Sequence, residues 1–337
     1  MKAKLPLTFN VFAAVLAALL SFGAATDSFA CSAVAGSEGA VVGGNYDWYA
    51  RGGIVFVSPR GQVKSSEATV EKPLAAHWVS KFGSVTVSQF GRDFPMQGMN
   101  EAGLAGMVLV GDSKYPASRD DATLTENLWL QYQLDHYETI DEVTRHVGDL
   151  GIKKLSASLH WFMCDRSRAC AVIEFLNGQA VVHAGTTLPV AALTNTTYDV
   201  AEAGYQGWRD AQDTVPDGYD SLARFIRLGE SGGRNVKSEL DDVSRRGFTA
   251  VQTVFDMEQR SLASRVEDGK WVSVSFRDIA FDCGPMPQML SLSVGTWEAY
   301  NHDAVVELFT RGTIGTIGLG PEIRDRILKA TEQISCR

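Results

Sequence analysis

A hydrophobic leader that ends directly before a cysteine most constrains what this chain folds into. Two lysines precede the uncharged run VFAAVLAALL, which has the length of a signal-peptide core and is too short to cross a bilayer as a helix. Ser28 and Ala30 are the small residues expected before a cut at the bond to Cys31. We therefore predict that residues 1–30 are a secretory signal peptide and that the mature chain begins at Cys31.

Two other fates of the leader stay open. A cut after Ala25, with Gly23 at the −3 position, would leave a short propeptide before Cys31. A lipoprotein signal also ends on a cysteine, but it favours an apolar residue where this chain has Ser28. Each route exports the chain, so we expect a protein of the periplasm or a secreted one.

The charge and hydropathy of the rest of the chain argue against nucleic acid and membranes as binding partners. The formal charge is −9, and loss of the net-positive leader makes the chain more acidic. Such a chain has no electrostatic reason to bind nucleic acid or an anionic membrane. No second apolar run reaches spanning length, so we predict no stable membrane insertion once the leader is removed.

The composition favours one large domain. The chain has 45% hydrophobic residues and seven tryptophans, enough for a sizeable core. No linker rich in Pro, Gly or Ser, no repeat and no low-complexity tract divides it. We expect a single domain over residues 31–337. The sequence leaves the oligomeric state open, a homo-oligomer included.

The five cysteines divide into two expected pairs and one free thiol. Cys164 and Cys170 flank DRSRA between two apolar runs, so they face each other across a predicted hairpin and can form a disulfide. Cys283 and Cys336 remain as a second, long-range pair, although the sequence does not prove the connectivity. Cys31 is then the odd thiol. A free cysteine is usually a small buried hydrophobe, an interpretation that fits poorly with a new chain end.

Strands occur in groups that are separated by groups of helices. Strand-like runs lie at 31–35, 40–45, 54–57, 84–90, 104–110, 158–164, 170–175, 180–183, 271–276 and 289–294. Helical patterns lie from about 125, after the capping box Thr139–Glu142, at 222–228, over about 240–257 and at 322–328. This order favours the α+β class, with two stacked antiparallel sheets covered by helices on the outside.

Common catalytic and metal-binding motifs are missing from the sequence. It has no G-x-S-x-G elbow, no P-loop and no H-E-x-x-H, and its six histidines lack metal-ligand spacing. We therefore expect neither a metal nor another cofactor. What remains is a set of polar residues in apolar surroundings: Asp47 in GGNYDW, Asn195 in ALTNTTYD and Arg224 in SLARFIR. Taken singly, each is better explained as structural, with Asp47 and Asn195 at strand ends and Arg224 on a solvated helix face.

Taken together, these segments resemble the choloylglycine hydrolases, which include bile salt hydrolases and penicillin V acylases, within the N-terminal nucleophile hydrolases. The resemblance covers nearly all of residues 31–337, through the cysteine start and then GGNYDW, GSVTVSQFGRDFPMQGMNEAGLAG, HWFMCDR, CAVIEF, ALTNTTYD and SLARFIR. It implies an αββα sandwich, in agreement with the expected layers. It also implies hydrolysis of a linear amide bond in an acylated small molecule.

The resemblance also implies a role for each polar residue. Cys31 would attack the amide carbonyl through its sulfur, with its own α-amino group as the base. An α-amine and a thiol both titrate near about pH 8, so a proton can pass between them without a histidine. Asp47 would hold the α-amine, Asn195 would serve the oxyanion, and Arg224 would set the electrostatics around Cys31.

Two positions depart from the family pattern. Gly44 stands where the family usually has an arginine that braces the nucleophile, and Arg51 and Arg224 are the candidates to replace it. Val110 stands where bile salt hydrolases usually present an asparagine. An oxyanion donor at that place would therefore be a backbone N–H, and the wall beside it would be more apolar.

The substrate expected from this chain is an apolar or aromatic acyl amide. We predict that Trp48 and Trp78, with Val110, bind a flat acyl group, since such rings stack well. This favours penicillin V or an N-acyl homoserine lactone over a conjugated bile salt, although both tryptophans read equally well as ordinary core. Two other functions stay open: an acyltransferase or peptidase of the same superfamily, and a periplasmic binding protein that lost activity with the arginine replaced by Gly44.

Overall fold

The computed structural model describes residues 31–284, 288–313, 319, 321–332 and 334–337. The predicted signal peptide, residues 1–30, therefore lies outside the described residues. No helix within the described ranges is long and apolar enough to cross a membrane.

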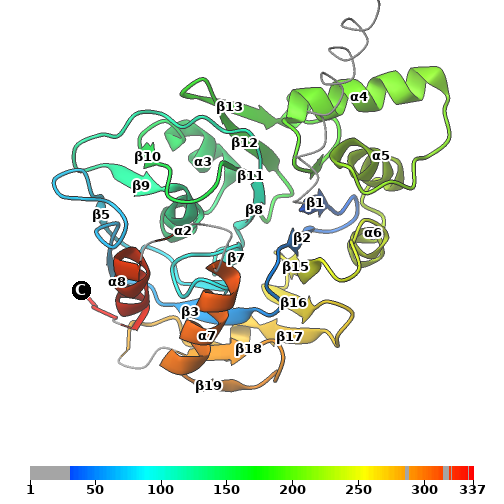
Figure 1. Ribbon diagram of the computed structural model, residues 1–337. Helices are drawn as coiled ribbons and strands as arrows, with labels where there is room; N and C mark the ends of the chain where they lie inside the picture. The colour runs from blue at the N-terminus through cyan, green and yellow to red at the C-terminus, as the bar shows by residue number, and fades with distance from the viewer. Residues whose placement is uncertain (1–30, 285–287, 314–318, 320, 333) are drawn as a thin grey trace, which may run out of the picture.

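Two antiparallel sheets stack face to face (Figure 1). The six-stranded sheet has the order β14-β1-β2-β15-β16-β17, with β1 Ser32–Ala35, β2 Val41–Asp47, β14 Ala192–Leu193, β15 Thr249–Asp256, β16 Ser261–Val266 and β17 Val272–Ser275. The nine-stranded sheet has the order β13-β12-β11-β8-β7-β6-β3-β18-β19. Its strands are β3 Ile54–Ser58, β6 Ser84–Ser88, β7 Gln97–Asn100, β8 Ala105–Val110, β11 Leu159–Cys164, β12 Cys170–Leu176, β13 Gln179–Ala184, β18 Gln288–Ser291 and β19 Trp297–Ala299.

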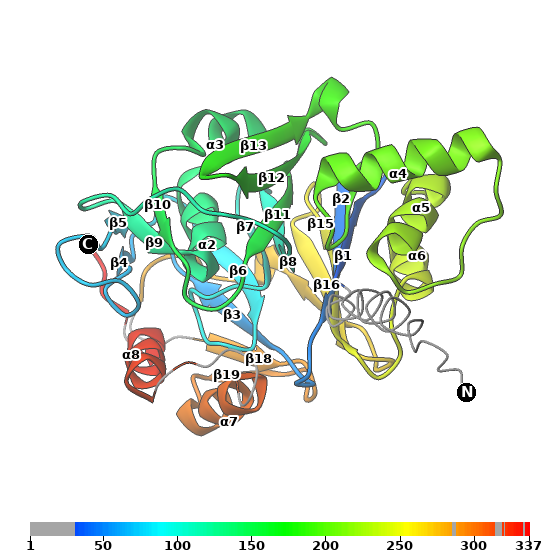
Figure 2. The same cartoon turned by 45° about the horizontal axis from the view of Figure 1, so that its top comes forward.

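Helices cover the outer faces of both sheets, as Figure 2 shows. On the side of the nine-stranded sheet lie α2 Glu126–His136 and α3 Ile140–His146, and on the other side lie α4 Tyr198–Ala211, α5 Ser221–Ser231 and α6 Val236–Asp242. The C-terminal helices are α7 His302–Thr313 and α8 Pro321–Glu332. Two small pairs complete the fold, antiparallel β4 Val63–Ser65 with β5 His77–Val79 and parallel β9 Thr123–Thr125 with β10 Gly151–Lys153. The predicted αββα sandwich is confirmed.

The two glycines of β2 show how closely the layers approach. A Cβ at Gly43 would lie 2.7 Å from Val236 and 2.9 Å from Leu240, both on α6. A Cβ at Gly44 would lie 3.0 Å from Gln97 of the facing sheet. β2 is thus covered on both faces, which is why its residues are buried almost without a break rather than alternately.

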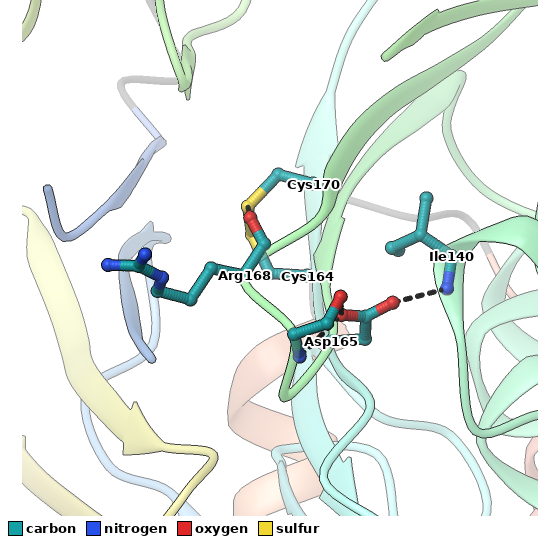
Figure 3. The surroundings of a disulfide bond; sticks show 6 residues. Ile140, Cys164, Asp165, Arg168 and Cys170 are labelled. Carbon is teal, nitrogen blue, oxygen red and sulfur yellow. Dashed lines mark hydrogen bonds between the residues drawn. A yellow bond between two sulfur atoms is a disulfide. The ribbon is translucent and has the colours of Figure 1, made fainter. Parts of the chain in front are cut away.

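The disulfides agree with the cysteine assignment. Cys164 and Cys170 are bonded and lie directly opposite each other on β11 and β12 (Figure 3). Cys283 is bonded to Cys336, which ties the C-terminal segment to the end of the nine-stranded sheet. Cys31 is the free cysteine of the described chain, and it is buried.

One predicted helix is wrong and two helices were not foreseen. The segment expected to be helical over about 240–257 contains only the last residues of α6, and from Thr249 it is the strand β15. Gly247 has a positive φ of 76° and turns the chain between them. The strand TAVQTVFD is rich in valine, threonine and phenylalanine, and its place between β2 and β16 decides in favour of the strand. Helices α4 and α7 were not predicted, whereas the capping box at Thr139 is confirmed.

Candidate active site

Cys31 lies directly before β1, in the space between the two sheets, and is fully buried. Its sulfur lies 3.9 Å from the carbonyl oxygen of Asp47 on the neighbouring strand β2. Burial, and after it the nearby Asp47 carboxylate, raise the pKa of the thiol, which is about 11 when all influences are combined. Backbone hydrogen bonds from Asp47 and Val110 and the charge of Arg224 act in the opposite direction. With residue 30 still attached, the sulfur is therefore held as a thiol at neutral pH.

Asp47 is a buried carboxylate at the end of β2. The antiparallel register sets Ser32 opposite Asn45. Asp47, two residues further along β2, therefore lies close to Cys31, which directly precedes β1. Neither carboxylate oxygen has a hydrogen-bond partner in the described structure. Burial raises the pKa of Asp47 to about 7, although the nearby Thr249 hydroxyl and two guanidinium groups lower it in part. A buried carboxyl group in this state is an acceptor that lacks a donor.

Arg224 links Cys31 to Asn195. Its side chain is 1% exposed and reaches from α5 beneath β1. Nη1 donates to the carbonyl oxygen of Cys31 and to Oγ of Ser32 (2.9 Å), and Nη2 donates to Oδ1 of Asn195 (2.8 Å). Burial lowers the pKa of Arg224, and Asp47 raises it, but a guanidinium stays charged in proteins. One cation thus fixes both the Cys31 carbonyl and the Asn195 amide.

The Asn195 amide is oriented by two hydrogen bonds. Since its oxygen accepts from Arg224, its nitrogen must face the other way, and Nδ2 donates to the carbonyl of Val110 (2.8 Å). A primary amide carries two N–H donors, and the described hydrogen bonds use one of them. The predicted oxyanion role of Asn195 would fall to the second N–H.

Val110, the last residue of β8, presents its backbone to the same place. The next residue, Gly111, donates its N–H to Ser158 (2.9 Å), so the Val110 pair with β11 is of the non-hydrogen-bonded kind and its N–H and C=O point away from β11. The C=O meets Asn195, and the backbone hydrogen bond to Cys31 lowers the thiol pKa, as an N–H donated to sulfur does. The Val110 N–H therefore lies beside the Cys31 sulfur, and its service to an oxyanion stays a prediction.

An apolar cavity adjoins this site. Two of its lining residues, Tyr46 and Val110, also interact with Cys31, since Cys31 raises the pKa of Tyr46 after the larger effect of burial. The cavity measures about 30 Å³, the space of roughly one water molecule. Its walls include Tyr46, Trp48, Phe90, Met96, Val108 and Val110. An acyl group enters only when these side chains move apart.

The two tryptophans predicted to bind substrate lie in different places. Trp48 lines the cavity beside Cys31, stacks at 5.8 Å on Tyr46 and donates from Nε1 to Gly312 (2.8 Å). Trp78 lies instead on β5, lines a separate cavity and donates from Nε1 to Asp135 (2.7 Å). The structure therefore does not bring Trp78 to Cys31.

The space beside Gly44 holds a glutamine rather than an arginine. Nε2 of Gln97, on β7 of the facing sheet, donates to the Gly44 carbonyl (3.1 Å). Arg51 is 62% exposed at its side chain and pairs with Glu267, so it does not reach the site. Arg224 is the cation that does. Sequence reasoning missed Gln97 and Tyr46, although the period-two alternation of GGNYD places Tyr46 on the same face as Gly44.

The site is thus made of Cys31, Asp47, Asn195 and Arg224 with the backbone of Val110, all brought together from β1, β2, β8, α5 and the segment before α4. Their catalytic roles stay predictions. Among the residues that the structure describes, no group of three or more His, Cys, Asp or Glu side chains could hold a metal ion.

Two facing antiparallel sheets covered by helices, with a buried free cysteine directly before the first strand, agree with the αββα fold that the sequence resemblance implies. Residues 31–226 match the family model of the linear amide C-N hydrolases, choloylglycine hydrolase family. Since this match spans more than half of the chain, the chain belongs to that family.

Individual relatives agree with this assignment. Penicillin V acylase of Pectobacterium atrosepticum is 36% identical over an alignment that covers 36% of this chain and 37% of the relative. The solved structure of penicillin V acylase from Agrobacterium tumefaciens matches 77% of this chain and 90% of its own, with 24% identity and a TM-score of 0.65. A mutant of conjugated bile acid hydrolase from Clostridium perfringens matches 80% of this chain and 96% of its own, at 16% identity and a TM-score of 0.63. At these identities the two structures show a shared fold.

Proposed function

We propose that the chain is exported, that it is cut between Ala30 and Cys31, and that the mature protein hydrolyses the linear amide bond of an acylated small molecule. Membership of a family of linear amide C-N hydrolases gives the reaction type. The observation that carries the proposal is the buried Asp47 carboxylate, which has no hydrogen-bond partner in the described chain and lies beside a free thiol.

The cut would supply the partner that Asp47 lacks. An α-ammonium group on Cys31 carries three donors and one positive charge, and it would replace a peptide nitrogen that has neither the charge nor the extra donors. A cation next to Asp47 lowers the pKa of the carboxyl group, and a cation next to the thiol lowers the pKa of Cys31. The same cleavage therefore charges Asp47 and activates the sulfur.

The reaction follows from these positions. The thiol of Cys31 passes its proton to the α-amine, and the sulfur attacks the carbonyl carbon of the amide. The oxyanion forms near the second N–H of Asn195 and the N–H of Val110, two donors from opposite sides of the site. The α-ammonium then gives its proton to the leaving nitrogen as the C–N bond breaks. Water, deprotonated by the same amine, then attacks the thioester carbonyl. The C–S bond breaks, the carboxylic acid leaves, and the α-ammonium returns its proton to the Cys31 sulfur.

The cavity supports an apolar or aromatic acyl group. Trp48 and Val110 line it together with Tyr46 and Phe90, and no side chain in that wall carries a charge. The relative named penicillin V acylase agrees with such an acyl group. We expect penicillin V or a long-chain N-acyl homoserine lactone to be a better substrate than a glycine-conjugated bile salt. Most of this wall is apolar, and its polar side chains Asn127 and Ser156 already hydrogen-bond to each other and to Glu126.

The test compares two chains that differ at one residue. One begins at Cys31 and the other retains Ala30, and both are given a panel of acyl amides. We expect hydrolysis by the first chain and none by the second, with matching circular dichroism spectra. Equal turnover by both would contradict the role of the α-amine. A mature chain that folds, binds acyl amides and hydrolyses none would favour the binding protein, and acyl transfer to an added amine in place of hydrolysis would favour the acyltransferase.

A further inference from the structure

A second buried carboxylate, Glu174, contacts the region behind the oxyanion donors. It lies on β12, is 1% exposed, and accepts the backbone N–H of Tyr198 with both oxygens, at 3.3 and 3.1 Å. Tyr198 is the first residue of α4 and follows Asn195 by three positions. A carboxylate at a helix N-terminus is electrostatically favoured. Glu174 therefore fixes the point at which the segment carrying Asn195 becomes helix.

The Glu174 carboxylate also contacts His160, whose ring packs against the residue that follows Val110. Nδ1 of His160 lies 3.0 Å from Oε1 of Glu174, and the His160 side chain is fully buried. The imidazole packs against Gly111, where a Cβ would lie 2.8 Å from the ring. Gly111 directly follows Val110, so the position of the ring limits where the end of β8 can lie. The close approach also requires glycine at this position.

The Asn195 segment is held from its other side by α5. Oγ of Ser221 accepts the N–H of Thr196 (2.8 Å) and bonds the hydroxyl of Thr194 (2.8 Å). Ser221 begins the helix that carries Arg224. The segment is thus fastened between two supports, one that comes with Arg224 and one that is Glu174.

We propose that Glu174 is a positioning residue for the oxyanion donors. It acts on the Asn195 amide through Tyr198 and on the Val110 N–H through His160, and the inference rests on the proposed amide hydrolysis. Both donors are aimed at charge that develops on the substrate oxygen, so displacing them slows the chemical step far more than it changes the reactivity of the thiol, whose pKa the Val110 N–H also lowers. A misplacement of about 1 Å is enough to cost roughly a hundredfold in rate.

The matched control is Asp165, on the turn of the same hairpin. Oδ2 of Asp165 accepts the N–H of Ile140, the first residue of α3, at 2.8 Å (Figure 3). Glu174 and Asp165 are both buried acids from the β11–β12 hairpin that hold the first N–H of a helix. Only the helix held by Glu174 follows a residue of the site.

The experiment measures four quantities on mature chains carrying Glu174→Gln or Asp165→Asn: kcat, KM, the rate at which iodoacetamide alkylates Cys31, and the thermal midpoint. Alkylation forms no oxyanion, so it reports on the thiol alone. We expect Glu174→Gln to lower kcat by about 10- to 100-fold, with KM and the alkylation rate within about twofold of the wild type. Asp165→Asn should leave kcat and the alkylation rate within about twofold.

Two further variants keep the test decisive. His160→Phe keeps the ring volume against Gly111 and removes the contact with Glu174. It should lower kcat by a larger factor than the alkylation rate, even where Glu174→Gln fails to fold. In an Asn195→Ala background, Glu174→Gln should cost less than it does alone, because its main target is gone.

Three outcomes would overturn the inference. The first is a fall in kcat that the alkylation rate of Glu174→Gln matches. The second is that the effects of Glu174→Gln and Asn195→Ala on kcat multiply in the double variant. The third is an unchanged kcat in both Glu174→Gln and His160→Phe. A wild-type chain that alkylates at Cys31 and hydrolyses no amide would overturn the proposed function and this inference with it. An active wild type with an unchanged kcat in those two variants overturns only the inference.

Discussion

The protein buries carboxylates in two ways, and the two regions differ in what surrounds them. Around Lys64, a buried ammonium group lies 2.8 Å from Asp93 and 3.0 Å from Asp135. Asp135 also accepts from Trp78 (2.7 Å) and Gln131 (2.8 Å). Asp47 is equally buried, but the described chain offers it no hydrogen bond.

This difference separates the structural carboxylates Asp93 and Asp135 from Asp47. Burial alone raises the pKa of a carboxyl group, and at Asp93 the Lys64 and Arg92 charges more than offset it, so that pKa is lowered. At Asp135 burial still raises the pKa, although Lys64 opposes it. This fold can therefore supply a cation and donors to a buried acid. At Asp47 the Thr249 hydroxyl and the Arg224 and Arg245 charges lower the pKa only in part, and the carboxylate oxygens have no hydrogen-bond partner in the described chain. We infer that a new chain end would complete the site.

The sharpest way to break this comparison is to remove the nucleophile. Cys31→Ala should reduce amide hydrolysis by the mature chain to the background rate without unfolding it. Cys31→Ser should be nearly as inactive, because an alkoxide is far harder to generate than a thiolate. Steady-state kinetics with circular dichroism measure both effects. An alanine variant with wild-type turnover would contradict the assignment.

Asp47→Asn should act in opposite directions before and after the cut. In the uncut chain the folded pKa of Asp47 is about 7 against 3.8 when exposed, so stability is full below about pH 4 and falls as the pH rises through 7. Three pKa units correspond to about 4 kcal/mol. Near pH 8 the uncut Asp47→Asn chain should therefore be more stable than wild type by up to about 4 kcal/mol, as urea unfolding measures.

The mature chain should respond in the reverse sense. There Asp47 would hold the α-ammonium of Cys31, so Asp47→Asn should lose stability and turnover together near pH 8. An uncut chain that is destabilised by the same substitution would show that Asp47 already has a partner.

Asp135→Asn should be destabilising in both forms. It leaves Lys64 with one carboxylate in a buried setting, where breaking a pair costs about 3–5 kcal/mol. The unfolding free energies of the uncut and mature chains should fall by the same amount, with kcat changed no more than stability requires. A loss confined to the mature chain would erase the distinction between the two regions.

The smallest effects separate the two tryptophans. Trp48→Phe should raise KM for penicillin V several-fold, since Trp48 lines the cavity beside Cys31. Trp78→Phe should leave KM unchanged and lower the thermal midpoint, since its Nε1 donates to Asp135. Equal changes in KM for both variants would contradict the placement of the acyl group.

Residues close to Cys31 along β2 were predictable from the sequence. The leader ends directly before Cys31, which makes this cysteine a candidate. The neighbouring strand β2 ends at Asp47, directly before Trp48. Their proximity needs only the register of one antiparallel pair. The order of motifs then brought Asn195 and Arg224 to the same place through the resemblance.

Residues whose position depends on tertiary packing were not predictable in this way. Trp78 follows an apolar run like that before Trp48, but no pairing links β5 to β1, and the tryptophan packs by Lys64. Glu174 carried a signal that went unused, because a glutamate within the buried run CAVIEF needs a partner. The segment from Thr249 is predicted as helix because its apolar spacing fits the helical period as well as the strand period. Its place in the sheet makes it a strand.

The central claim is that cleavage before Cys31 gives Asp47 its cation and activates the thiol. The direct measurement is a pH titration of the ultraviolet absorbance of the Cys31 thiolate, in the chain that retains Ala30 and in the chain that begins at Cys31, each against its Cys31→Ala variant. The account predicts a thiol pKa of about 11 in the first chain and one near or below about 8 in the second. The same pKa in both chains would contradict it.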